Sequence, residues 1–154
     1  MSYTSGEQVE SIAQRLIPKH HSEIADARIK YIFKEKGSKK GNKIVYGSAK
    51  KCSALMDYFI DADFLIEVAL DAWNELSESK RVALVDHLLE RCTGEEDEET
   101  GGMKWKVRDP DVHEFSTILK RHGAWTTTLT EFVSVAQSVD LSFMTASQDP
   151  TTVN

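Results

Sequence analysis

Apolar and polar residues alternate in the first third of the chain with the period of a β-strand. Between residues 27 and 33 every second residue is apolar or aromatic, and most residues between them are basic. A period of two predicts a strand with one buried and one exposed face. A turn-rich segment follows, and we expect residues 43–47 to form a second strand that pairs with the first as a hairpin.

Residues 64–70 form a nearly continuous apolar run. A run of this length is typical of a buried strand or of a helix start, and periodicity alone does not separate the two. We predict a strand over residues 64–69 and a helix from Asp71. The pattern then becomes helical after Ser77, whose hydroxyl suits a helix N-cap. A helix is therefore predicted over residues 78–92.

The N-terminal segment is predicted to be helical. Ser5 and Gln8 have the spacing of a capping box, and apolar residues follow at helical spacing until Pro18, which should end the helix. Residues 1–23 would then form a helix and connector ahead of a domain over residues 24–140.

Two helices are predicted in the C-terminal third. Asp109-Pro110 matches an N-cap residue followed by proline at the first helical position, which predicts a helix near residues 110–122. Gly123 stands where such a helix commonly ends. A last helix is expected from Thr128, followed by a flexible tail over residues 141–154.

This order of elements predicts one α+β domain in which a small β-sheet packs against helices. The 154 residues, of which 40% are hydrophobic, are enough for one such domain. The following residues are expected to be largely buried in its core: Phe33, Phe64, Ile66, Val85, Leu89, Phe115 and Ile118.

Charge is distributed unevenly along a chain whose net charge is −6. Residues 19–51 contain ten Lys or Arg and three acids, whereas residues 52–102 contain fourteen acids and three bases. The Lys-rich stretch 28–51 is compatible with nucleic-acid binding, because clustered lysines displace counterions from phosphate. It is equally compatible with the solvated face of a hairpin. An isoelectric point near 5.4 favours the hairpin. The acidic run 95–99 suits either a self-repelling loop or a DNA-mimicking surface.

The composition also indicates in which cellular compartment the protein is expected. No apolar run approaches the ~18 residues of a membrane-spanning helix, and the first residues lack the basic-then-apolar order of a secretion signal. Two cysteines, Cys52 and Cys92, do not make a disulfide framework. We therefore expect a cytoplasmic protein that does not interact with membranes.

One of the five histidines lies in a pattern with chemical meaning. His87 belongs to the helix predicted after the buried strand 64–69. Metal-dependent peptidases place His-Glu-x-x-His on such a helix, because histidines four residues apart share one face and can bind the same zinc ion. The glutamate between them activates the zinc-bound water.

Five stretches, taken together and in order, resemble one known family, the phage metallopeptidases, which are small zincin-like proteins encoded by bacteriophages. The stretches are Ala27–Phe33, Asp63–Ala69 with Trp73 following, Ala83–His87, Lys104–Arg108, and Asp111–Phe115 continuing through Arg121–Trp125. The resemblance covers about residues 24–125. It implies the minimal zincin-like metallopeptidase fold.

The resemblance also implies where a zinc site would be. Family members read Asp-His-Glu-x-x-His where this chain reads Asp86-His87-Leu88-Leu89-Glu90-Arg91. His87 matches the first ligand, but Leu88 replaces the catalytic glutamate and Arg91 the second ligand. A leucine accepts no proton, and an arginine offers no lone pair to a metal. Pro110 stands at the start of the helix from which the family takes a further ligand.

We therefore expect no catalytic residue and no cofactor, and interpret His87 as a hydrogen-bonded or partly solvated helix residue. A rebuilt zinc site would have to draw on His87, His113 or Glu114. His20 and His21 are expected to be solvated loop residues.

These observations predict a phage-encoded, catalytically inactive metallopeptidase-like protein in the host cytoplasm. It would bind, and thereby inhibit, a host protein such as a DNA-processing or defence enzyme; this last step is an analogy, since a fold alone does not fix a function. Two other functions stay open. One is a zinc-dependent metallopeptidase or other hydrolase with a rearranged site, and the other is a DNA mimic or a nucleic-acid-binding protein acting through residues 28–51.

Overall fold

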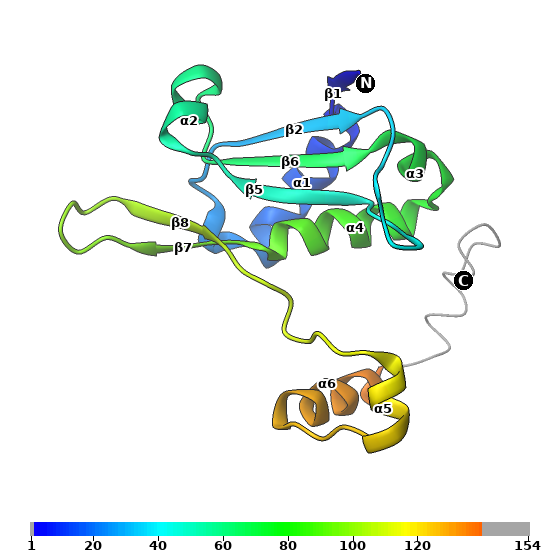
Figure 1. Cartoon of the computed structure of the whole chain (residues 1–154). Coiled ribbons are helices and arrows are strands. Elements are labelled where there is room, and N and C mark those ends of the chain that lie inside the picture. Colours follow the sequence, from blue (N-terminus) through cyan, green and yellow to red (C-terminus); the bar gives the residue numbers. More distant parts are fainter. Residues whose placement is uncertain (1, 140–154) are drawn as a thin grey trace. The chain divides into compact units, whose positions relative to one another are not determined.

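The computed structural model of the chain describes residues 2–139. They form two compact units, residues 2–108 and residues 109–139. The first unit combines a small sheet with helices, and the second contains two helices (Figure 1). The mixed helix and strand content confirms the predicted α+β class.

The sheet of the first unit has four strands in the order β1-β2-β6-β5. β2 runs parallel to β6, with Ile29 opposite Phe64 and Lys34 opposite Ala69. β1 and β5 are the edge strands, antiparallel to β2 and β6 respectively. The bounds of the strands are β1 (Tyr3–Ser5), β2 (Ile29–Lys34), β5 (Gly47–Lys51) and β6 (Phe64–Ala69).

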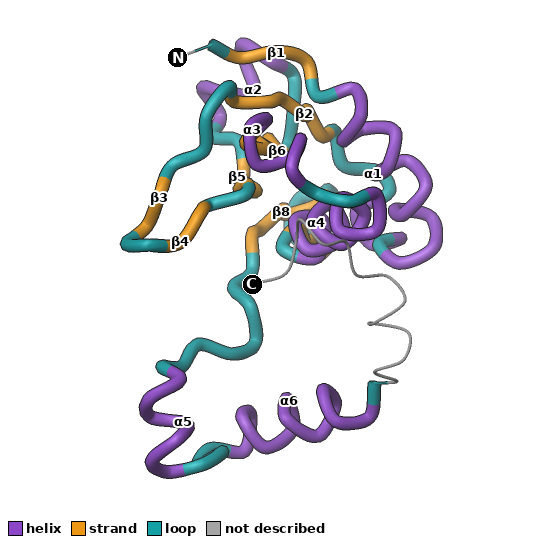
Figure 2. The backbone as a smooth tube through the Cα atoms, turned by 90° about the vertical axis from the view of Figure 1, so that its right-hand side faces the viewer, coloured by secondary structure: helices purple, strands orange, loops and turns teal. Residues whose placement is uncertain are grey.

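Two helices cover one face of this sheet. α1 contacts α4 and β2, and α4 also contacts β5, so the pair lies across the sheet (Figures 1 and 2). Shorter helices connect the strands. The bounds of the helical segments are α1 (Glu7–His20), the 3₁₀ turn η1 (Ser22–Ile24), α2 (Ala54–Ile60), α3 (Leu70–Glu75) and α4 (Glu78–Glu90).

The core lies between the sheet and the α1–α4 layer. Phe33, Phe64, Ile66, Val85 and Leu89 are all buried, as predicted. Burial of such side chains stabilises the fold by roughly 1.5–3 kcal/mol each. The rest of the core comes mainly from α1, β6, α3 and α4, and its largest members include Val9, Ile12, Ile24, Val68, Trp73, Leu88 and Cys92.

Two hairpins complete the first unit. The small one joins β3 (Lys39–Lys40) to β4 (Lys43–Ile44), with its lysines exposed, and Gly41 in its turn has a φ of 66°, a conformation that favours glycine. The larger one joins β7 (Cys92–Glu96) to β8 (Met103–Val107).

The second unit consists of α5 (Ser116–His122) and α6 (Thr127–Ser138). Gly123, at a φ of 68°, ends α5 as predicted. Thr126 caps α6 by accepting a hydrogen bond from the Leu129 amide, so this helix begins one residue before the predicted Thr128.

Several elements match their predictions closely. β6 occupies residues 64–69, α3 begins at Leu70, and Ser77 caps α4 by accepting a hydrogen bond from the Lys80 amide. Within residues 2–139, no helix combines the length and the apolar composition needed to cross a membrane. The domain limits predicted at residues 23 and 140 stay a prediction, and the predicted tail 141–154 lies outside the described residues.

The predicted pairing of residues 43–47 with the first strand is wrong. β5 pairs with β6, while the two sides of β2 are taken by β1 and β6. Residues 43–44 instead close the small β3–β4 hairpin. Turn signals between two strands predict a reversal of the chain, but they do not determine which neighbour the second strand finds in the sheet.

The predicted start and end of the first helix are also wrong. Ser5 lies in β1 opposite Ile32, and Gly6 precedes the helix, with its amide bonded to the Tyr31 carbonyl. The backbone there is so close to β2 that a Cβ on Gly6 would lie 2.8 Å from the Tyr31 carbonyl carbon. Pro18 lies inside α1, near its end, where its fixed φ suits a helix and only one backbone hydrogen bond is lost.

Asp109-Pro110 does not begin a helix. α5 starts only at Ser116, and Phe115 ahead of it keeps an extended backbone with ψ 135°. Asp109 precedes Pro110, and residues before proline favour extended conformations over helical ones. Phe115 therefore does not lie on a buried helical face. It is 74% exposed, and Ile118 is only half-buried, so their predicted burial is wrong.

The acidic run 95–99 is not simply a loop. Glu95 and Glu96 belong to β7, where Lys104 stands opposite Glu95 and the Lys106 ammonium lies 2.8 Å from the Glu95 carboxylate. These lysines lower the pKa of Glu95 through hydrogen bonding and charge, and they offset part of the repulsion expected from the sequence alone.

Candidate functional site

Helix α4 carries the residues that the sequence analysis singled out. Its start is fixed by the Ser77 cap and by Glu78 in the first turn, where a negative charge favours the helix dipole. Val85, Leu88 and Leu89 are its buried residues and fix the rotation of the helix against the sheet. This rotation determines which of the neighbouring side chains of α4 lie in the core and which lie at the surface.

Leu88 belongs to the core. Its side chain is 2% exposed and lies against β5, where a Cβ added at Gly47 would be 3.0 Å from the Leu88 Cδ1. Leu88 thus fills space that the missing side chain of Gly47 leaves open. Its surroundings are apolar and do not suit a carboxylate.

His87 and Arg91, four residues apart, lie on a different side of α4. His87 is exposed, which fits the second of its two interpretations, a hydrogen-bonded or a partly solvated helix residue, and Arg91 is half-buried. The Arg91 guanidinium donates from Nε to the Arg108 carbonyl over 3.2 Å, and the Arg108 amide donates to the Arg91 carbonyl over 2.7 Å. Arg91 therefore connects the end of α4 to the end of β8.

The buried histidine of the site is His21, which the sequence analysis placed in solvent. Its side chain is 4% exposed, so that expectation is wrong. Nε2 lies 2.6 Å from Oδ1 of Asp86, and Nδ1 lies 3.5 Å from Oε2 of Glu90. Because Asp86 and Glu90 are four residues apart, α4 presents both carboxylates on one side to the imidazole.

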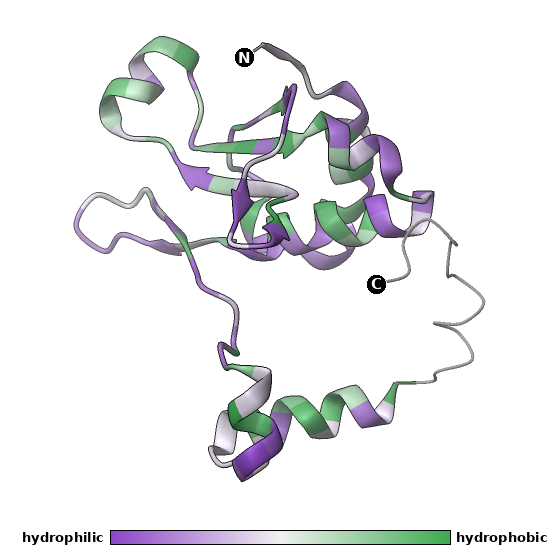
Figure 3. Cartoon of the chain, turned by 45° about the vertical axis from the view of Figure 1, so that its right-hand side comes forward, coloured by the Kyte–Doolittle hydropathy of each residue, from purple (hydrophilic) through white to green (hydrophobic). Residues whose placement is uncertain are grey.

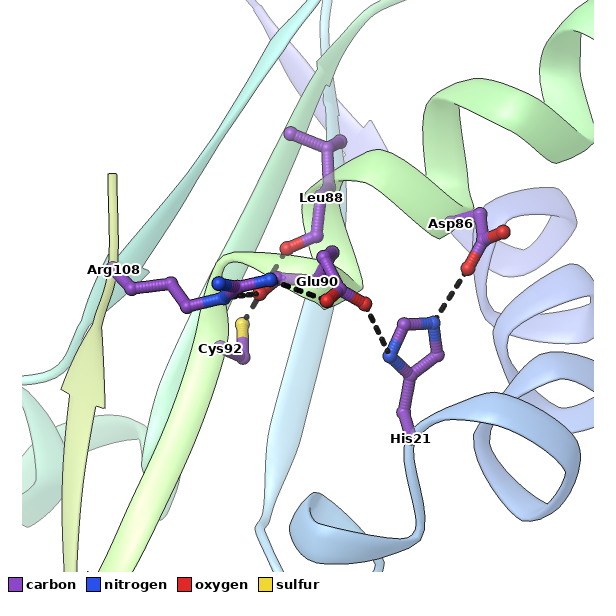
Figure 4. Close-up of polar contacts among 6 residues, drawn as sticks. All are labelled: His21, Asp86, Leu88, Glu90, Cys92 and Arg108. Atoms are coloured by element: carbon purple, nitrogen blue, oxygen red, sulfur yellow. Dashed lines mark hydrogen bonds and ion pairs between the residues drawn. The ribbon is translucent and has the colours of Figure 1, made fainter. Parts of the chain in front are cut away.

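Glu90 continues this network toward β8. Its carboxylate pairs with the Arg108 guanidinium, and Arg108 Nε donates to the Glu90 carbonyl over 2.9 Å (Figure 4). The chain of contacts from His21 through Glu90 to Arg108 joins η1, α4 and the end of β8. No local signal in the sequence predicts it, since it depends on how three distant segments pack.

Cys92 lies at the end of the same stretch and is buried. Its thiol donates to the Leu88 carbonyl, with Sγ 3.6 Å from the oxygen. Burial raises the pKa of Cys92 to about 12, against a smaller opposing effect of Arg91. The thiol therefore stays protonated at neutral pH, whereas metal binding and nucleophilic attack require the thiolate.

The two other proposed ligands, His113 and Glu114, are exposed residues of the second unit. The Glu114 carboxylate accepts hydrogen bonds from the Phe115 amide, over 2.8 Å, and from the Trp125 indole, over 3.3 Å. Across residues 2–139, no three His, Cys, Asp or Glu side chains are grouped so that they could hold a metal ion.

Comparison with known families agrees with the resemblance seen in the sequence. The family described as "Putative phage metallopeptidase" matches residues 1–136, and the chain belongs to this family. Comparison with curated proteins found no match. Comparison with solved structures likewise found none.

A metallopeptidase family implies a catalytic metal ion, and the side chains of α4 that the sequence resemblance aligns with the zinc-binding motif do not fit one. His87 is of a ligand type, but Leu88, which is aligned with the catalytic glutamate, accepts no proton and lies in the core. Arg91 is permanently cationic and bonded to the backbone of β8. A catalytic zinc site takes three ligands from its protein, but His87 is the one ligand type at the aligned motif positions, and the neighbouring carboxylates of Asp86 and Glu90 are paired with His21 and Arg108.

Proposed function

We propose that this member of the family is catalytically inactive and acts by binding a host protein, such as a DNA-processing or defence enzyme. The observation that carries the proposal is the burial of Leu88. A zinc peptidase needs a carboxylate beside the metal-bound water, and the residue that corresponds to it here is a leucine packed against β5.

The charges around His87 also support inactivity. Arg91 lies one helical turn away and holds a permanent positive charge, whereas the charge of Arg108 at the same end of α4 is paired with the Glu90 carboxylate. Positive charges near a prospective ligand disfavour a divalent cation there.

The remaining carboxylates of the stretch are engaged in structural contacts. Asp86 holds His21, and Glu90 pairs with both His21 and Arg108. A general base must be able to reach the proton that it abstracts, and these contacts direct the two groups toward η1 and β8 instead. The network therefore supports a role in holding the scaffold together.

The proposal is tested by comparing hydrolysis and binding in the untagged protein. Wild type, His87→Ala and the control His20→Ala would be assayed for cleavage of a casein-derived peptide library with added zinc, and for capture of proteins from host lysate. We expect no cleavage by any of the three and equal capture by all three, because His87 serves no metal.

Zinc-dependent cleavage that His87→Ala abolishes and His20→Ala leaves intact would contradict the proposal. It would favour the hydrolase with a rearranged site. Absence of any captured protein would contradict the binding role.

A further inference from the structure

Helix α2 exposes most of its large apolar side chains. Leu55 is 69% exposed, Tyr58 82% and Phe59 74%, and α2, which lies wholly within the described residues, contains no buried residue. The two rings form an edge-to-face pair with centroids 5.2 Å apart. Figure 3 shows this helix as a mainly hydrophobic segment projecting from the first unit.

Polar contacts hold α2 in place. Ser53 caps its start by accepting a hydrogen bond from the Met56 amide, and Asp61 ends it in a left-handed conformation with φ 53°. The Arg28 guanidinium bonds to Asp63 over 2.8 Å and pairs with Asp57 over 3.1 Å and with Asp61. The position of α2 therefore does not depend on its exposed aromatic side chains. These side chains remain accessible to solvent, although their burial would be energetically favourable.

An acidic hairpin projects from the same end of the sheet. β8 passes this end where Trp105 packs on Phe64, the first residue of β6, with ring centroids 5.8 Å apart. Figures 1 and 3 both show α2 and the β7–β8 tip extending to the same side of the first unit.

The hairpin dominates the charge of this end. Residues 92–107 contain five acids and two lysines, which leaves a net charge of −3. Around α2, the charges of Lys50, Lys51 and Arg28 balance those of the three aspartates at 57, 61 and 63. A neutral apolar helix thus stands beside a negatively charged arm.

We propose that α2 and the β7–β8 hairpin form one docking surface for a host protein that presents an apolar pocket next to a basic, nucleic-acid-binding face. The inference rests on the proposed binding function and specifies the partner's chemistry. Exposed aromatic side chains provide the anchors that dominate protein interfaces, and the hairpin supplies complementary charge. The same negative charge opposes nucleic acid, anionic lipid and a second copy of this surface.

The test uses the full-length protein immobilised as bait in nuclease-treated host lysate. One variant removes the apolar anchors, Tyr58→Ser with Phe59→Ser, and one removes charge from the hairpin tip, Glu98→Gln with Glu99→Gln. The controls make the same kinds of change at exposed residues elsewhere: Phe132→Ser with Val135→Ser, and Glu23→Gln with Glu131→Gln. Circular dichroism and urea midpoints establish that all variants are folded.

We expect one host protein whose capture falls at least about tenfold in the apolar variant, as for interface hot spots, and falls more weakly in the charge variant. Both controls should retain it. A 20-base-pair DNA duplex added in excess should release it from the wild-type bait, because the duplex and the hairpin would compete for one basic face.

Each other outcome overturns the inference. Capture that survives the Tyr58 and Phe59 changes, or that the duplex does not reduce, leaves the binding function standing and refutes this surface. Binding of the purified wild type to the duplex itself, or to vesicles containing phosphatidylserine, would assign α2 and the hairpin to another class of ligand. Absence of any captured protein would refute the binding function as well.

Discussion

Leu88, at the residue scale, links the stability of the fold to the proposed loss of activity. Its side chain occupies the core next to β5, where a carboxylate does not fit. We expect Leu88→Glu to lower the free energy of unfolding by about 3–5 kcal/mol, because the new charge would be buried without a partner. Leu88→Ala and Leu89→Ala should each lower it by about 2–5 kcal/mol.

Urea denaturation of these variants provides the measurement, with His87→Ala as the exposed control, expected to change stability by less than about 0.5 kcal/mol. A Leu88→Glu protein as stable as wild type would show that α4 can turn this position toward solvent. It would remove the main support for inactivity.

The two adjacent histidines, His20 and His21, offer a matched pair of substitutions. His21→Ala leaves Asp86 and Glu90 without their buried partner, and we expect a loss of about 2 kcal/mol, as for hydrogen bonds to charged groups. His20→Ala changes an exposed residue and should have little effect. Equal effects of the two substitutions in urea denaturation would contradict the structural role of the His21 network.

Asp63 should make the stability of the protein depend on pH. Burial by itself raises its pKa, but the hydrogen bonds and charge of Arg28 outweigh this effect and hold the pKa below its ordinary value. A carboxylate with a lowered folded-state pKa stabilises the protein above its unfolded-state pKa, and this stabilisation is lost as the pH falls through the folded-state value.

Asp63→Asn lacks this titration. When the pH is lowered from about 6 to about 2.5, the free energy of unfolding of Asp63→Asn should therefore fall by less than that of the wild type or of the exposed control Asp26→Asn. Chemical denaturation at both pH values tests this. A loss in Asp63→Asn as large as that of the wild type would refute the stabilising effect of Arg28 on Asp63.

The β7–β8 hairpin, at the scale of elements, depends on a glycine. A Cβ added at Gly94 would overlap the Trp105 ring, at 2.7 Å from its Cζ3, whereas the atom nearest a Cβ at Gly102 would be Thr100 Oγ1 at 3.6 Å. Gly94→Ala should destabilise the hairpin by about 1–3 kcal/mol, as other overpacking changes do, and Gly102→Ala should not. Hydrogen exchange of the β8 amides measures the difference, and equal protection in both variants would contradict it.

Elements with local signals could be predicted from the sequence, and their pairing could not. The Ser77 cap and the apolar run at 64–69 define α4 and β6 from neighbouring residues. The parallel pairing of β2 with β6 depends on contacts 35 residues apart, between Ile29 and Phe64, for example. No property of the strands themselves distinguishes that partner from β5.

The candidate site was predictable only in part, for the same reason. The residue types at His87, Leu88 and Arg91 are read directly from the chain, and their chemistry limits what they can bind. The role of His21 depends on the packing of η1 against α4. An isolated His-His pair beside a helix end carries no signal that one ring is buried and the other exposed.

Considered as a whole molecule, the chain belongs to a phage metallopeptidase family, and Leu88, which the sequence resemblance aligns with the catalytic glutamate, lies in its core. The family match extends over both units, from residue 1 to residue 136. In the first unit, β6 and α4 contribute to the core as predicted, and residues 86–91, which the sequence resemblance aligns with a zinc-binding motif, take part in the core and in contacts with η1 and β8.

The most direct test of this account is the zinc content of the untagged protein, measured by mass spectrometry after purification in zinc-supplemented buffer and desalting. We predict well under one equivalent, the same in wild type and in His87→Ala, because a catalytic site needs three protein ligands and this stretch of α4 offers one. About one equivalent of zinc in wild type, lost in His87→Ala, would contradict the account and indicate a working metal site.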